Sequence, residues 1–299
     1  MKSMKRIVAV ALCAAALAGT YSASASQSID QKVPADPQGT VEINNTSGTI
    51  HCIGWDKPEI QITGQLSGSA ERLDVQTQGK TVSIRVLQRM GIVSHGDNDL
   101  EIKAPFGSSL RVSGVSADIN VRGITGEQRL QSVSGDVETE AAGADLVLKS
   151  ISGNLKLRGK NNPLRTTVST VSGSISLVNV GGELDMDTVS GDVDIDMNTV
   201  TRARMKTISG DVGMVGRLSA DSRIDLSSVS GNLHMRWPGA EKANVEVESF
   251  SGDITSCFGN VEVQRPKYGP GSSWRYGVTG ATSDIHIKSM SGDVNVCNR

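Results

Sequence analysis

The sequence predicts an all-β fold, namely a single parallel β-solenoid with coils of about 18–21 residues. Three observations predict it. A Val-Ser-Gly-Asp-Val theme recurs at a nearly fixed interval, apolar and polar residues alternate on both sides of it, and no segment after residue 25 sustains the apolar period of a helix. The theme centres on Gly135, Gly153, Gly173, Gly191, Gly210, Gly231, Gly252 and Gly292, with Ala117 in the same place one repeat earlier.

Each repeat predicts one coil of chain, which can bury its apolar face only against neighbouring coils. Apolar residues fall seven, five and two positions before the glycine and two and four positions after it, and Ser or Thr falls three before. We interpret Ser-Gly as a corner between two short strands, because glycine adopts the backbone conformations that tight corners need. Stacked coils then place ladders of Val, Ile, Leu and Met in the interior and a polar ladder of Ser and Thr at the corner.

The chain divides into a leader, a lead segment and the repeat array. Residues 1–25 combine a basic start, a short apolar run and an Ala-Ser-Ala site, which is typical of a secretory signal peptide. Residues 26–40 are expected to be a flexible lead, because prolines and a glycine interrupt them. Residues 41–299 are expected to form the β-solenoid domain, with an aromatic-rich excursion at 264–280. No later segment is expected to cross a membrane, so we expect an exported chain in the periplasm or at the cell surface of a bacterium.

The charge balance argues against nucleic acid as a partner. The chain has 30 basic and 32 acidic side chains, and removal of the three basic residues of the leader changes its net charge from −2 to −5. A mildly acidic chain without a basic block lacks the electrostatic footprint of nucleic-acid binding. Aromatic residues make up 3% of the chain, which is low for a carbohydrate enzyme with a deep cleft.

The residue after each corner glycine is the strongest candidate for metal chemistry. Carboxylates stacked about 5 Å apart could hold Ca²⁺, which takes oxygen ligands. The alternative is that these side chains cap the corner by hydrogen bonding to nearby backbone, a role that Asn and Ser also fill. We favour capping, and predict no metal site and no cofactor. The acidic members are Asp118, Asp136, Asp192, Asp211, Asp253 and Asp293, and Asn154, Ser174 and Asn232 interrupt them.

No catalytic residue is predicted. The Gly-x-Ser-x-Gly motif does not occur, and the many serines belong to the repeat. The four histidines have no metal-ligand spacing and are expected to face solvent. They are His51, His95, His234 and His286.

Aromatic residues gather near the end of the chain, where six of the eight outside the leader lie between positions 237 and 276. Exposed aromatic rings rimmed by cations could stack on sugars or anchor a partner. The alternative, which we favour, is a cap over the end of the solenoid, because terminal coils need covering. The possible binding patch consists of Tyr268, Trp274, Tyr276, Arg265, Lys267 and Arg275.

Three cysteines remain after the leader. Cys257 and Cys297 both lie five positions after their repeat glycine, so they stack if their coils are neighbours. Adjacent strands about 4.8 Å apart are close enough for a disulfide. We favour this disulfide, with one coil and an excursion between the two cysteines rather than two coils. Cys52 has an inward phase and is expected to be a buried thiol.

The sequence resembles the bacterial DUF4097 family of putative adhesins, which are exported proteins of β-strand repeats. The resemblance rests on Gly48-Thr49-Ile50, Gly54-Trp55-Asp56, Ile60-Gln61-Ile62-Thr63-Gly64, Ala104-Pro105-Phe106-Gly107-Ser108-Ser109-Leu110 and the Ser-Gly-Asp repeats. It covers nearly all of the chain after the leader. It implies an envelope or surface location and an adhesin-like or scaffold role, and it carries no catalytic residues to transfer.

Together these observations favour a non-enzymatic exported envelope protein that offers a binding surface or scaffold to polysaccharide or to another protein. Two alternatives stay open. One is a β-helical polysaccharide lyase or hydrolase, which would need clustered carboxylates in a groove. The other is a periplasmic partner in envelope stress. The oligomeric state and the identity of the ligand are not indicated by the sequence.

Overall fold

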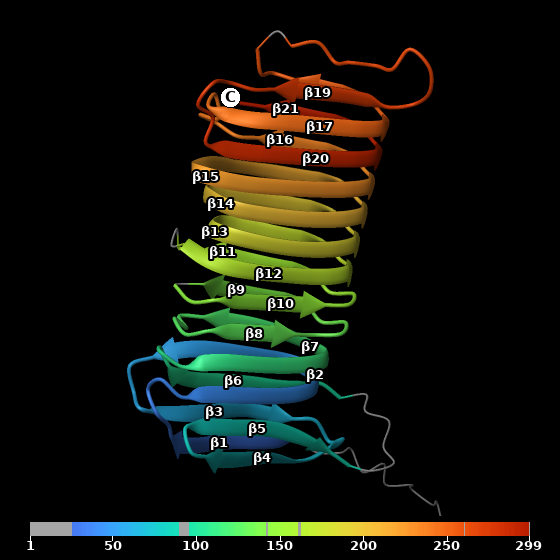
Figure 1. The fold of residues 1–299 in the computed structure, drawn as a ribbon. Helices are drawn as coiled ribbons and strands as arrows, with labels where there is room; N and C mark the ends of the chain where they lie inside the picture. The colour runs from blue at the N-terminus through green and yellow to red at the C-terminus, as the bar shows by residue number, and fades with distance from the viewer. Residues whose placement is uncertain (1–25, 90–95, 142, 161–162, 260, 299) are drawn as a thin grey trace, which may run out of the picture.

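The computed structural model describes residues 26–89, 96–141, 143–160, 163–259 and 261–298. The expected signal peptide and His95 lie outside the described residues. Within these ranges the chain forms 21 strands and no helix, so the predicted all-β class is confirmed. The strands stack into one elongated column (Figure 1). The described residues accordingly include no helix that is long and apolar enough to cross a membrane.

The middle of the column is an array of parallel strands, in which each coil pairs with the coil before it and the coil after it. Leu148 pairs with Leu130 on one side and with Val168 on the other, and Met186 and Met205 continue this buried ladder. The strands of the array are β7 (Ser109–Arg122), β8 (Gln128–Gln131), β9 (Val137–Ala141), β10 (Leu146–Ser150), β11 (Leu155–Gly159), β12 (Pro163–Ser172), β13 (Ile175–Ser190), β14 (Val193–Ser209), β15 (Val212–Ser230) and β16 (Leu233–Arg236).

The N-terminal end departs from sequential stacking. Its strands are β1 (Gln27–Pro34), β2 (Thr40–Trp55), β3 (Glu59–Leu66), β4 (Ala70–Gln78), β5 (Thr81–Gln88) and β6 (Asn98–Pro105). The first coil, β2, pairs in parallel with β7 on one side and with β5 and β6 on the other, so the coil made of β5 and β6 lies outside it. Strands β3 and β4 then cover the end by antiparallel pairing with β6 and β5.

The expected flexible lead at 26–40 is wrong for most of its length. Residues 27–34 form β1, which pairs antiparallel with all of β3. Ile29 is buried against the core, and backbone pairing supplies the order that the local sequence did not suggest. Pro34 ends the strand, which agrees with the inability of proline to donate a ladder hydrogen bond.

The C-terminal end repeats this arrangement. Its strands are β17 (Ala243–Ser251), β18 (Ile254–Ser256), β19 (Ser272–Tyr276), β20 (Ser283–Ser291) and β21 (Val294–Cys297). The last coil, β20 and β21, is inserted between the coil of β15 and β16 and the coil of β17 and β18. The two coils are therefore neighbours, as expected, but the C-terminal coil is not the outermost one. Strand β19, within the predicted excursion, pairs antiparallel with β17 and closes the end (Figure 1).

Candidate binding surface

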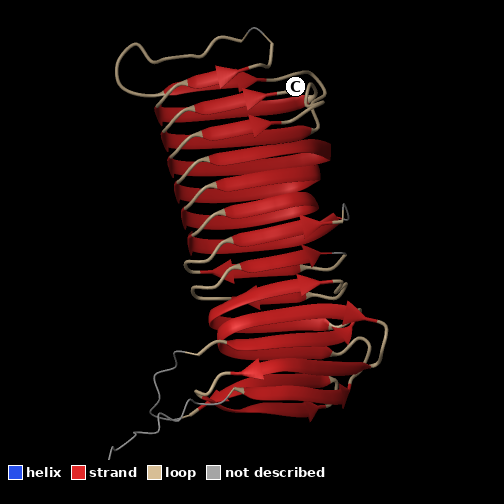
Figure 2. Ribbon diagram, turned by 180° about the vertical axis from the view of Figure 1, so that it is seen from behind, coloured by secondary structure: helices blue, strands red, loops and turns tan. Residues whose placement is uncertain are grey.

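The Ser-Gly corners line up along one edge of the column (Figure 2). Gly210 shows why this position needs glycine: its φ is +116°, and a Cβ atom there would lie 2.3 Å from the carbonyl oxygen of Gly191 in the adjacent coil. Both the backbone conformation and the neighbouring coil therefore exclude a side chain. Gly191 stands in the same relation to Gly173, and Gly173 to Gly153, so the predicted in-line stacking of the corners is confirmed.

The Ser and Thr residues three positions before the glycines form the predicted polar ladder inside the corner. All are at most 6% exposed. Ser150 Oγ accepts a hydrogen bond from the backbone N–H of Gly153 at 2.8 Å, and Thr207 Oγ1 donates one to the carbonyl of Ser209 at 3.3 Å. A small hydroxyl side chain thus fits the tight inner corner, and in these two coils it forms a hydrogen bond with the backbone of the corner. The ladder consists of Ser132, Ser150, Thr170, Thr188, Thr207, Ser228, Ser289 and Ser249.

The Asp and Asn residues after the glycines cap the corner of the neighbouring coil rather than their own. A side-chain oxygen of Asp136 accepts a hydrogen bond from the backbone N–H of Asn154 at 2.8 Å, and Asn154 repeats this contact to Ser174 at 3.0 Å. Asn serves as well as Asp because the contact needs only an oxygen acceptor. The same contact links, in spatial order, Asp192, Asp211, Asn232, Asp293 and Asp253.

These contacts support the capping interpretation over a calcium site. The carboxylate oxygen that faces the next coil is already occupied by a backbone N–H group. In the part of the chain that the structure describes, no group of three His, Cys, Asp or Glu side chains could hold a metal ion.

The apolar residues two positions before the glycines lie outside the column, which corrects the expectation for this one position; the aliphatic residues seven and five positions before the glycines and two and four after them form the interior as predicted. The inward alternation runs on through the Ser/Thr ladder, so the next residue points to solvent. These residues are between 38% and 56% exposed and make up nine of the fourteen exposed large hydrophobic residues within the described ranges. We call them the apolar ridge; in spatial order they are Val115, Val133, Ile151, Val171, Val189, Ile208, Val229, Met290 and Phe250.

The apolar ridge runs along most of the corner edge. Adjacent strands lie about 4.8 Å apart, so its nine members span roughly 38 Å. Val171, Val189, Ile208, Val229 and Met290 border a groove of about 580 Å³. Four members of the Ser/Thr ladder also line it, together with the polar residues Ser169, Asp187, Lys206 and Ser227. A contiguous exposed apolar surface of this kind marks contact with another molecule far more often than isolated surface residues do.

The predicted aromatic patch divides into a buried cap and an exposed tip. Trp274 is 1% exposed, and its Nε1 donates a hydrogen bond to the carbonyl of Val261 at 3.1 Å. Its ring stacks with that of Tyr276 at a centroid distance of 6.2 Å, and Phe258 contacts both rings. Because Trp274 is buried, it cannot offer an open platform to a sugar, and the cluster covers the outermost coil, made of β17 and β18, as the favoured alternative describes.

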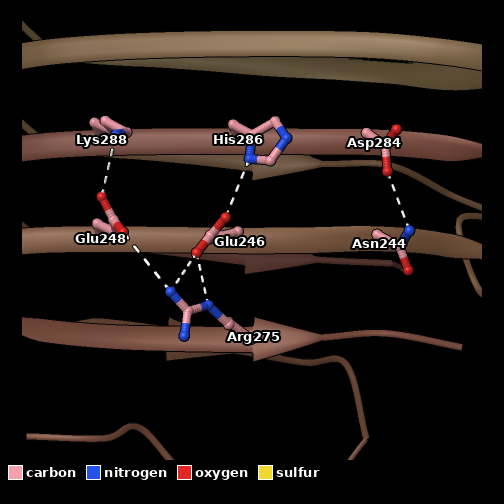
Figure 3. A network of polar contacts seen from close by, with 7 residues as sticks. All are labelled: Asn244, Glu246, Glu248, Arg275, Asp284, His286 and Lys288. Carbon is pink, nitrogen blue, oxygen red and sulfur yellow. Dashed lines mark hydrogen bonds and ion pairs between the residues drawn. The ribbon is translucent and has the colours of Figure 1, made fainter.

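The three cations of the patch differ in how far they are engaged. Arg275 on β19 donates to the carboxylate of Glu246 at 2.6 Å and lies 3.9 Å from Glu248, while His286 and Lys288 contact the same two carboxylates from β20 (Figure 3). The hydrogen bond from Arg275 is the main reason why the pKa of Glu246 is lowered below its usual value. This network fastens the edge strand β19 to β17, and β17 in turn to β20.

The exposed tip of the excursion holds the rest of the patch. Tyr268 is 83% exposed, and Lys267 Nζ lies 5.5 Å from its ring centroid. Arg265 is paired with Asp253 at 2.6 Å. Of the predicted patch, the structure thus leaves Tyr268 and Lys267 as the members that face solvent without an anionic partner within the described residues.

The structure contains the disulfide between Cys257 and Cys297, with Cα atoms 4.6 Å apart on neighbouring coils. Cys52 is buried, as predicted, and burial raises the pKa of its thiol to about 12. A structural disulfide persists in oxidising compartments outside the cytoplasm. The disulfide therefore indicates an extracytoplasmic protein, and the fold is a column of β-coils with covered ends and one long exposed apolar edge.

The chain belongs to the DUF4097 family. The family profile, described as Toastrack DUF4097, matches residues 39–297. Among solved structures, the chain is similar to a "putative adhesin" from Parabacteroides distasonis ATCC 8503, with 14% identity over 90% of this chain and 97% of that chain and a TM-score of 0.55. It is also similar to a "putative adhesin" from Bacteroides fragilis NCTC 9343, with 12% identity, coverage of 90% and 97% and a TM-score of 0.46.

A third structure, a "putative lipid binding protein" from Parabacteroides distasonis ATCC 8503, has 12% identity, coverage of 90% and 96% and a TM-score of 0.47. At such identities the likeness establishes the fold alone. No curated protein matches the chain. None of these comparisons indicates an enzyme family.

Proposed function

We propose that this chain is an exported, non-enzymatic protein of the bacterial envelope, in the periplasm or at the cell surface, whose apolar ridge is an adhesin-like binding surface for another protein. The observation that carries the proposal is the ridge itself, nine outward apolar side chains at one position of successive coils. Because these side chains are exposed, they contribute little to the stability of the core of the column. Contact with a partner would remove this surface from water and would stabilise the complex by about 25 cal/mol for each Å² of apolar area buried.

Protein is favoured over polysaccharide by the polar groups that accompany the ridge. A polysaccharide presents hydroxyl groups, and burying them against aliphatic side chains without hydrogen bonds costs free energy. The neighbouring Ser and Thr hydroxyls face the inside of the corner, and the Asp and Asn ladder already accepts backbone N–H groups. Apart from Asp187 and Lys206 in the lining of the groove, the edge therefore offers a partner more apolar contact than free hydrogen-bonding capacity.

The same contacts weigh against the alternative of a polysaccharide lyase or hydrolase. Such an enzyme would need a pair of carboxylates free to exchange protons or to attack a sugar. The carboxylates at the corner positions instead recur with the repeat, and each accepts a hydrogen bond from the backbone of the next coil, except Asp253, which pairs with Arg265. The similar structure from Parabacteroides distasonis is described as a "putative adhesin", and an adhesin-like role for this chain would agree with the surface proposed here.

Binding of the mature chain to isolated envelopes of the producing bacterium tests the proposal. We expect the triple variant Val189→Ser/Ile208→Ser/Val229→Ser to lose most of the binding while keeping the melting temperature, because all three side chains are at least 41% exposed. The matched control Ile53→Ser/Val261→Ser removes apolar side chains of similar exposure (37% and 44%) away from the ridge and should bind normally.

Treatment of the envelopes identifies the partner. Protease treatment should abolish binding and periodate oxidation of sugars should not. Unchanged binding by the triple variant would contradict the role of the ridge. Loss after periodate alone would favour polysaccharide, and release of reducing sugar by the wild-type chain would favour the enzyme alternative.

A further inference from the structure

A second surface feature lies on a different face of the column, over the strands that follow the corner. It is a hollow of about 450 Å³ above the first residues of β14 and β15 and above β16, and residues of β13 and β21 border it on either side. Its floor is made by Gly213 and Val215 of β15. The apolar ridge belongs to the corner edge and shares no residue with this hollow.

Gly213 occupies the middle of a regular strand pairing, where glycine weakens a sheet unless it has a reason to be there. The usual reasons are a bulge, a sharp bend or the close approach of another backbone or a ligand. Pairing is continuous from Val193 with Val212 to Met197 with Gly216 on one side, and β15 pairs with β16 without a shift on the other. No bulge is therefore present at this point.

Close approach of another backbone segment is also ruled out for Gly213. A Cβ atom built there would have only two neighbours within 4 Å, Asp194 Oδ1 at 3.1 Å and the carbonyl oxygen of Val193 at 3.8 Å. The first of these is the end of a movable side chain. Apart from the Asp194 carboxylate, the space in front of Gly213 is thus open to solvent, and a glycine here leaves room for a ligand beside that carboxylate.

The charges around the hollow have opposite signs on its two sides. The register places Asp194 and His234 on either side of Gly213, and Asp196 and Arg236 on either side of Val215. Each pair is two strand spacings apart, about 9.6 Å. Within the described residues, neither carboxylate has an ion-pair or hydrogen-bond partner for its side chain, and neither does Arg236.

We infer that this hollow is a binding site for a small zwitterion of dipeptide size, with its ammonium group at the two aspartates and its carboxylate at Arg236. Ligand atoms within about 2.8 Å of each wall would lie roughly 4–6 Å apart, given the strand spacing and the residue rise. The two residues of a dipeptide span at most roughly 7 Å. Its side chains would lie over Gly213 and Val215, where a longer residue at position 213 would exclude them.

A calorimetric titration of the mature chain with the dipeptide Ala-Ala tests this site. We expect saturable binding of the free dipeptide. N-acetylated Ala-Ala and Ala-Ala amide should each bind about tenfold more weakly or worse, because each has lost one charge-assisted contact. Absence of saturable binding, or equal affinity for all three compounds, would overturn the inference.

Variants separate the site from general effects on folding. Gly213→Val should abolish binding without lowering the melting temperature, because valine suits a strand and only a movable side chain must yield. The control Thr255→Val changes the same repeat position outside the hollow and should bind normally. Arg236→Gln should bind Ala-Ala and Ala-Ala amide with equal affinity, because it has lost the partner of the carboxylate. Asp194→Asn/Asp196→Asn should bind Ala-Ala and N-acetylated Ala-Ala with equal affinity, because it has lost the partners of the ammonium group.

Wild-type affinity in Gly213→Val, or unchanged preferences in the charge variants, would contradict the assignment. The ridge triple variant should bind the dipeptide as the wild type does. Failure of this inference therefore leaves the proposed function intact, and the reverse also holds.

Discussion

Replacing Gly210 with alanine should destabilise the protein strongly, whereas the same replacement at Gly213, three residues later in the same coil, should not. At Gly210 the φ of +116° is one that side chains rarely adopt, and the new Cβ would lie 2.3 Å from the carbonyl oxygen of Gly191. The strained backbone alone costs about 1–3 kcal/mol. The overlap requires the adjacent coil to move and adds about 1–3 kcal/mol, as overpacking does.

At Gly213 neither effect operates. The backbone is a regular strand, and the nearest atom to the new Cβ is a movable carboxylate oxygen at 3.1 Å. Replacing a strand glycine with alanine should instead stabilise by about 0.5–1 kcal/mol, because the unfolded chain loses freedom. Urea unfolding followed by circular dichroism measures both free energies. Equal midpoints for the two variants would refute the assignment of Gly210 as an obligatory corner glycine.

Three further predictions use the same stability assay. Val193→Asp should lower the free energy of unfolding by several kcal/mol, because it places an unpaired charge in the core. Asp194→Lys, on the exposed neighbouring residue, should lower it only slightly. Similar losses in the two variants would contradict the assignment of Val193 to the inner face and Asp194 to the outer face. Millimolar Ca²⁺ should change the melting temperature little, and a rise of several degrees that disappears in Asp192→Asn/Asp211→Asn would overturn corner capping. Reduction of the disulfide, which closes a segment of 40 residues, should cost about 4 kcal/mol or less, and free thiols in oxidised protein would refute the bridge.

The repeated part of the fold could be predicted from the sequence because each position of the coil recurs with the same chemistry. Alternation around Gly173, Gly191 and Gly210 indicates strand, corner and inward face in every copy, and identical coils can stack only in register. Strand order at the two ends has no such signal. Nothing local in β2 or β20 distinguishes a coil that is last from one that is inserted between two others.

The exposed edge was only partly predictable for a related reason. The apolar residue before Ser-Gly has the composition of a core position, and its direction depends on whether the Ser or Thr before it faces inward. In Thr207-Ile208, the threonine takes the inward place and bonds the corner, so the isoleucine faces solvent at 51% exposure. The capping contacts to the next coil, as from Asp136 to Asn154, depend on stacking and cannot be derived from a single repeat.

The inserted coils at the two ends have a consequence for how the column comes apart. In a simple stack, the terminal repeat has one neighbour and can fray without disturbing the rest. Here the final segment, 283–297, holds strand partners on both sides, so its release would detach the coil of β17 and β18 as well as expose the edge of β15. Fraying at this end is thus coupled across two coils. During synthesis this segment emerges after β15 and β17, and until it arrives each of these two strands has an edge that no earlier part of the described residues closes.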